Sequence, residues 1–110
     1  MRIDIMGSTW EIIEKTEQED PRLDGSDGIC DWTTRRIIIR KDMDGNLADM
    51  DRYTRKVKRH EIVHAFLLEC GLDESSNAAD AWARNEEMVD WFARLGPRIY
   101  KVWREAGAAE

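Results

Sequence analysis

The chain has few of the residues that most often bind metals or form disulfide frameworks. Only two cysteines and two histidines occur among its 110 residues. Cys30 and Cys70 are far apart and belong to no C-x-x-C pattern, so neither a disulfide framework nor a cysteine zinc site is predicted. Both cysteines suit a reducing cytoplasm. With no third histidine, a histidine metal site must take a further ligand from another residue type.

Long apolar runs are also missing. We therefore predict neither a signal peptide nor a membrane span, and expect a cytoplasmic protein. Hydrophobic residues make up 42% of the chain and charged residues 36%, a balance typical of a globular protein. The length predicts one domain over residues 1–110, with room for a single core and only a shallow active site.

The net charge of −6 argues against a nucleic-acid-binding surface or an anionic-membrane surface. We therefore expect neither of these partners. One local basic run stands out, comprising Arg55, Lys56, Lys58 and Arg59. We interpret it as the solvated flank of a helix, with an acidic partner as the alternative.

The first forty residues have the pattern of β-strands. Alternating apolar residues around Gly7 predict a hairpin between residues 2 and 16, followed by a polar loop from 17 to 28. A second strand pair is predicted at 29–32 and 36–40. The three isoleucines at 37–39 could form an exposed edge strand or a buried central one, because a continuous apolar run does not distinguish the two.

The rest of the chain has helical periodicity. A long helix is predicted from about Leu47 to Gly71, and a second from residues 73–75 to about Leu95. A third helix is predicted to begin at Pro97, a residue that suits a first helical turn. The predicted fold class is therefore α+β, with a small, mostly antiparallel sheet followed by three helices.

The first of these helices carries the motif His60-Glu61-Ile62-Val63-His64. Residues four apart lie on one face of a helix, so the two imidazoles can bind a single metal ion. Glu61 lies beside them, where it can accept a proton from a water molecule. This H-E-x-x-H arrangement is typical of zinc peptidases.

A catalytic zinc usually has three protein ligands, so another segment must supply one. Glu86 and Asp90 lie four residues apart on the second predicted helix and share its apolar face. A carboxylate in that position is costly unless a partner such as a metal ion neutralises it. Cys70 is a weaker alternative, and Glu87 lies about a hundred degrees around the helix from Glu86.

Asn85-Glu86-x-x-x-Asp90 downstream of H-E-x-x-H closely resembles the paired motifs of the thermolysin-like gluzincins. The resemblance covers residues 55–92. It implies that His60, His64 and Glu86 bind Zn²⁺ and that Glu61 is the general base. It also implies that Asp90 accepts a hydrogen bond from a zinc ligand, which we take to be His60. The layout is similar to that of compact zincins encoded by bacterial phages and mobile elements, which implies a bacterial cytoplasm.

The resemblance leaves the oxyanion stabiliser open, since gluzincins use a separate histidine or tyrosine and this chain has no spare histidine. Tyr53, Tyr100 and Arg98 are the candidates. The expected function is zinc-dependent hydrolysis of a peptide or protein substrate. Two alternatives remain: a non-catalytic zinc-binding regulatory or interaction protein, and a metal-free protein that binds a partner.

Overall fold

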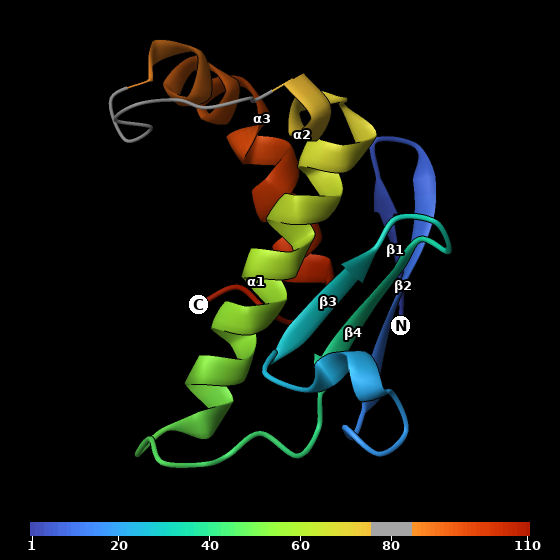
Figure 1. Cartoon of the computed structure of the whole chain (residues 1–110). Helices are drawn as coiled ribbons and strands as arrows, with labels where there is room; N and C mark the ends of the chain where they lie inside the picture. The colour runs from blue at the N-terminus through green and yellow to red at the C-terminus, as the bar shows by residue number, and fades with distance from the viewer. Residues whose placement is uncertain (76–84) are drawn as a thin grey trace.

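The fold combines two β-hairpins with two long helices that cover one face of the sheet (Figure 1). The computed structural model describes residues 1–75 and 85–110, without the side chains of residues 74, 75, 86 and 89. The elements are β1 (Arg2–Ile5), β2 (Ser8–Lys15), the 3-10 helix η1 (Pro21–Leu23), β3 (Gly28–Asp31), β4 (Arg36–Arg40), α1 (Met50–Glu69), α2 (Leu72–Ser75) and α3 (Glu86–Glu105).

The four strands form one mixed sheet in the order β1-β2-β4-β3. The β1–β2 and β3–β4 pairs are antiparallel, as both predicted hairpins require, but β2 and β4 pair in parallel at the centre. The predicted mostly antiparallel sheet is therefore corrected to a mixed one. The strand patterns fix each hairpin, but they do not determine which strands of the two hairpins become neighbours.

The isoleucines of β4 lie at the centre of the sheet rather than at its edge. Ile37, Ile38 and Ile39 are all at most 1% exposed. Ile37 and Ile39 face the helices and join the main core, while strand alternation directs Ile38 to the opposite face. The edge strand on this side is β3. The edge-strand interpretation of residues 37–39 is therefore wrong.

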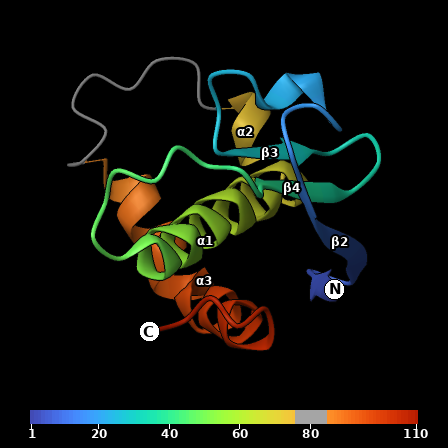
Figure 2. The ribbon, with the colours of Figure 1, turned by 90° about the horizontal axis from the view of Figure 1, so that it is seen from below.

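Helix α1 carries the H-E-x-x-H motif and packs against β3 and β4. The Asp49 side chain caps its N-terminus by accepting a hydrogen bond from the Arg52 N–H at 3.0 Å. The helix ends before Gly71, whose φ of +79° is a left-handed conformation that favours glycine. Its buried apolar residues are Val57, Ile62, Ala65 and Phe66. Figure 2 shows α1 lying between α3 and the β3–β4 half of the sheet.

The prediction of three helices is wrong. In the described part of the chain, α2 spans only four residues, and a single helix, α3, runs from Glu86 through Pro97 to Glu105. Residues 76–84 of the predicted second helix lie outside the described residues. Proline usually interrupts a helix because it lacks an N–H donor. Here the stripe Trp91, Leu95, Ile99 and Val102 packs into the core on both sides of Pro97, and this tertiary packing outweighs the local preference.

Among the described helices, none combines the length and the apolar character that crossing a bilayer requires.

The end of α1 is joined to the sheet through the Glu69 carboxylate. It accepts hydrogen bonds from the Trp10 indole N–H at 2.9 Å, the Ser8 hydroxyl at 3.3 Å and the Arg35 guanidinium at 2.8 Å. Burial alone would raise the pKa of Glu69, but the hydrogen bonds from Arg35 and Trp10 outweigh it and lower the pKa. Glu69 thus links α1 to β2 and to the turn before β4.

We predict that Glu69→Ala destabilises the protein by about 2–3 kcal/mol, because it leaves the Trp10 N–H and the Arg35 guanidinium without their acceptor. Since the folded pKa of Glu69 is lowered, its contribution is present above the ordinary glutamate pKa and is lost as the pH falls through the folded value. Urea unfolding between neutral and acidic pH measures both effects. Glu14→Ala, at an exposed position of β2, is the control. Equal stability of the two variants at neutral pH would contradict the prediction.

Candidate metal centre

The two histidines of α1 bring their Nε2 atoms together. His60 Nε2 and His64 Nε2 are 3.1 Å apart, with the rings inclined at 75°. Two nitrogens that each bind a tetrahedral zinc ion at about 2.0–2.1 Å would be about 3.3 Å apart. The helix therefore holds the two imidazoles close to the separation that a shared zinc ion requires.

The protonation of His60 also suits metal binding. Partial burial lowers the pKa of His60, and the nearby His64 and Lys56 lower it further. A lowered pKa keeps the imidazole neutral at neutral pH, and the neutral ring is the form that binds metals.

Glu61 lies on the sheet-facing side of the same helical turn. It is only 6% exposed, and within the described part of the chain its carboxylate forms no hydrogen bond. Burial raises the pKa of Glu61, and the nearby His64 offsets part of this increase. A buried carboxylate with a raised proton affinity has the character that a general base needs.

Gly28, at the start of β3, makes room for Glu61. A Cβ atom on Gly28 would lie 2.9 Å from Glu61 Cγ and 3.0 Å from both Glu61 Oε1 and Val57 Cγ1. These distances are shorter than ordinary van der Waals contacts, so any larger residue at position 28 would force a neighbour to move. The absence of a side chain at this point of β3 therefore lets Glu61 pack directly against the edge strand.

A cleft of about 210 Å³ runs along α1 from the motif towards the start of the helix. Its lining residues are Ser26, Asp27, Gly28, Tyr53, Lys56, Val57, His60 and Glu61. The Tyr53 hydroxyl donates a hydrogen bond to Asp27 at the opposite wall. Of the three candidate oxyanion stabilisers, Tyr53 lies in this cleft with His60 and Glu61. Tyr100 and Arg98 lie on α3 and line other hollows.

No motif in the sequence points to residues 26–28 as part of the site. They meet α1 only in the folded chain, across a long separation in sequence. The run Asp24-Gly25-Ser26-Asp27-Gly28 directly before a strand was the available signal, because glycine beside a strand often marks a close approach of the backbone.

The predicted third ligand, Glu86, is the first residue of α3, and its side chain lies outside the described residues. Asn85 caps this helix by accepting a hydrogen bond from the Met88 N–H at 3.1 Å. Asp90 is exposed and accepts a hydrogen bond from Arg94 at 2.9 Å. No described hydrogen bond joins Asp90 to His60. The roles of Glu86 and Asp90 therefore stay predictions.

Among the described side chains, no group of three or more His, Cys, Asp or Glu residues is arranged to hold a metal ion. Within that part of the chain, the candidate centre consists of His60 and His64 with Glu61 beside them.

Neither cysteine joins this centre in the described part of the chain. The thiol of Cys70, the weaker candidate ligand, donates a hydrogen bond to the Leu67 carbonyl at 3.5 Å. Burial, together with the nearby Glu61, raises the pKa of Cys30 on β3 to about 12, which keeps this cysteine a neutral thiol.

No family model matches this chain, and comparison with curated proteins and with solved structures finds no match either.

We predict that Gly28→Ala destabilises the protein by about 1–3 kcal/mol, because the added methyl group overlaps Glu61 and Val57. Chemical unfolding measures this loss. The matched control is Gly45→Ala, whose Cβ would lie an ordinary 3.7 Å from Met50 Cγ. A Gly28→Ala variant as stable as Gly45→Ala would show that the contact with Glu61 is not tight.

Proposed function

We propose that this protein is a zinc-dependent peptidase that hydrolyses peptide bonds with Glu61 as general base. The observation that carries the proposal is the 3.1 Å approach of the His60 and His64 Nε2 atoms next to the largely buried Glu61 carboxylate, which forms no hydrogen bond among the described residues. Neutral imidazole nitrogens with one further carboxylate form a donor set that suits catalytic Zn²⁺. The resemblance of Asn85-Glu86-x-x-x-Asp90 to the gluzincin motif supports Glu86 as that further ligand and Asp90 as a positioning residue.

In this mechanism, His60, His64 and Glu86 would hold the zinc ion. When bound, zinc polarises the peptide carbonyl and lowers the pKa of a water molecule from about 16 towards 7. Glu61 accepts the proton of the attacking water on its carboxylate, as its raised pKa favours. It then donates this proton to the nitrogen of the departing amine. The buried position of Glu61 against Gly28 holds the carboxylate in place through both steps.

The edge strand β3 supports binding of an extended peptide. The Arg40 N–H donates to the Asp27 carbonyl at 2.8 Å, which makes Asp27 and Arg40 a hydrogen-bonded pair. Such pairs alternate along an antiparallel ladder, so the N–H and C=O groups of Gly28 and Cys30 point away from β4. A peptide strand added at this edge would lie beside the cleft that contains His60 and Glu61.

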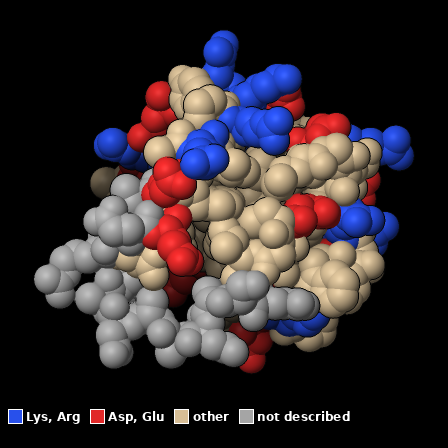
Figure 3. All heavy atoms as spheres, turned by 90° about the horizontal axis from the view of Figure 1, so that it is seen from above, with Lys and Arg blue, Asp and Glu red and all other residues tan. Residues whose placement is uncertain are grey.

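The charge distribution favours a peptide over a nucleic acid. On the face in Figure 3, basic and acidic side chains are interspersed around uncharged surface. Two residues of the basic run contact the C-terminal end of the same chain. Arg59 donates a hydrogen bond to the Ala108 carbonyl at 2.9 Å, and Arg55 forms an ion pair with Glu110 at 3.5 Å. By resemblance to compact phage and mobile-element zincins, we propose that the protein acts in the cytoplasm of a bacterial host.

The alternative is a non-catalytic zinc protein with a regulatory or interaction role. A structural zinc site has no need of a base beside the ion, and it usually has four Cys or His ligands. Glu61 is mostly buried yet lines the cleft beside His60, a position that a purely structural site does not require. The presence of this carboxylate favours the peptidase.

The metal content of the purified protein tests the site. We expect about one zinc per chain by mass spectrometry, lost in Glu86→Ala and kept in Glu61→Gln. Glu87→Ala is the matched control, because Glu87 is the exposed neighbour of Glu86 at the start of α3. A wild-type protein that takes up no zinc even when it is supplied would end the peptidase proposal. Equal zinc loss in Glu86→Ala and Glu87→Ala would remove Glu86 from the ligand set.

The second test concerns the base. On any peptide that the zinc-loaded protein cleaves, Glu61→Gln should lower kcat by about 100-fold or more while leaving zinc bound, because glutamine cannot accept the proton. A peptide-library digest read by mass spectrometry supplies the substrate. Unchanged turnover in Glu61→Gln would exclude Glu61 as the base.

A further inference from the structure

Hydrolysis of a peptide bond requires a group that stabilises the negative charge on the carbonyl oxygen. When water adds to the carbonyl carbon, one electron pair of the C=O bond moves to the oxygen and makes it an oxyanion. A donor aimed at this oxygen stabilises the transition state more than the bound substrate, and so raises the rate. The sequence leaves three candidates for this donor, Tyr53, Arg98 and Tyr100, and the structure separates them by position.

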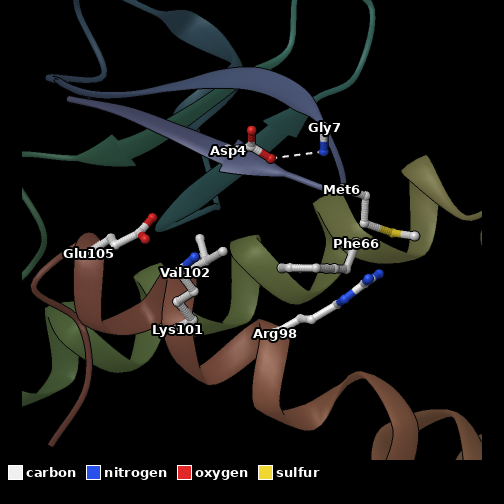
Figure 4. Close-up of a pocket in the computed structure, with 8 residues that line it drawn as sticks. All are labelled: Asp4, Met6, Gly7, Phe66, Arg98, Lys101, Val102 and Glu105. Atoms are coloured by element: carbon white, nitrogen blue, oxygen red, sulfur yellow. Dashed lines mark hydrogen bonds between the residues drawn. The ribbon is translucent and has the colours of Figure 1, made fainter.

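Arg98 and Tyr100 lie away from the cleft beside the metal centre. Arg98 lines a hollow of about 480 Å³ between the β1–β2 turn and α3, where its side chain runs towards Met6 and Phe66 (Figure 4). Phe66 follows His64 by two residues on α1, which places it about 200° around the helix. Tyr100 lines a further hollow on the surface of α3. Neither hollow shares a lining residue with the cleft.

Tyr53 does line the cleft, but its hydroxyl proton is already in use. The hydroxyl donates to the Asp27 carboxylate on the opposite wall. This hydrogen bond raises the pKa of Tyr53, so the proton stays on the hydroxyl. A phenol has a single donor hydrogen, and turning it towards a substrate would leave the Asp27 carboxylate without this partner. Tyr53 therefore suits the role of holding Asp27 in place.

Lys56 supplies positive charge to the same cleft. Among the described residues that line the cleft, it is the sole lysine or arginine. It precedes His60 by four residues, so the two side chains are neighbours on one face of α1. Its ammonium lies over the Tyr53 ring, 5.7 Å from the ring centroid, and forms no ion pair with a described carboxylate. Asp27, at the hydroxyl end of that ring, is not paired with it either. The three donor hydrogens of Lys56 are therefore available.

We infer that Lys56 stabilises the oxyanion in this cleft, an inference that rests on the proposed function. As water adds to the carbonyl carbon and Glu61 takes its proton, the Lys56 ammonium donates a hydrogen bond to the carbonyl oxygen and keeps its own proton. The electron pair on that oxygen then re-forms the C=O bond. The C–N bonding pair leaves on the nitrogen, which takes the proton from Glu61. Lys56 thus acts on charge that exists only between these two events.

Isothermal titration calorimetry with paired peptides tests this role without turnover. Each pair consists of an end-blocked tetrapeptide and its phosphinic analogue, in which an anionic tetrahedral phosphinate replaces the central amide, and the two central side chains are alanine, leucine or phenylalanine. The zinc-loaded Glu61→Gln protein prevents hydrolysis of the parent peptides. We expect at least one analogue to bind at least about tenfold more tightly than its parent, since it resembles the transition state.

In the same background, Lys56→Met keeps the aliphatic stem and removes the charge. It should weaken binding of the analogue about tenfold and leave the parent peptide nearly unchanged. Lys56 is exposed, so we expect a smaller effect than the about 100- to 1,000-fold loss that is usual for a preorganised oxyanion donor. Lys56→Arg retains the charge and should restore most of the affinity. Lys58→Met, on the same helix but outside the cleft lining, is the matched control.

The outcomes separate this inference from the proposed function. If no phosphinic analogue binds more tightly than its parent, the peptidase proposal and the role of Lys56 both fail. If the analogue binds tightly but Lys56→Met loses no more affinity than Lys58→Met, the role of Lys56 alone is overturned. It is also overturned if Lys56→Met weakens the parent and the analogue equally, or if Tyr53→Phe weakens the analogue as much as Lys56→Met does.

Discussion

The close approach of α1 to β3 at Gly28 is the constraint on which the candidate centre depends. Gly28 has no side chain, so Glu61 and Val57 can pack directly against the edge strand. This contact fixes the rotation of α1 about its own axis, because it places one residue of the motif against the sheet. His60 then lines the cleft while His64 is half-buried on the same face. The same packing thus buries Glu61, the proposed base, and leaves the imidazole nitrogens side by side.

Local patterns in the sequence were sufficient to predict both hairpins and helix α1. Alternation at Ile3 and Ile5 is confirmed in β1. The long helix predicted from about Leu47 is also confirmed, although it begins later, at Met50 after its Asp49 cap. The errors concern relations between segments. Parallel pairing of β2 with β4 depends on how two finished hairpins meet, which no local pattern encodes. Pro97 predicted a break, but the core contacts of Leu95 and Ile99 on either side keep α3 continuous.

The candidate centre was predictable to the extent that a helix fixes the spacing of its own side chains. Two histidines four residues apart had to share a face, so the convergence of His60 and His64 followed from the period of the helix. The contribution of Asp27 and Gly28 to the cleft could not be derived in this way, because it arises from contacts between α1 and the start of β3, which is far away in the sequence. The roles assigned to Glu86 and Asp90 rest on a sequence motif alone. In the structure, Asp90 accepts a hydrogen bond from Arg94.

The length of β3 limits how firmly a peptide could be held at this edge. The strand has only four residues, and of these Gly28 and Cys30 direct their backbone groups outward. Each supplies one N–H and one C=O, and each hydrogen bond adds only about 1 kcal/mol in net terms. A peptide held mainly by its backbone would therefore dissociate quickly. In the proposed peptidase, discrimination between substrates would then depend on side chains in the adjoining cleft.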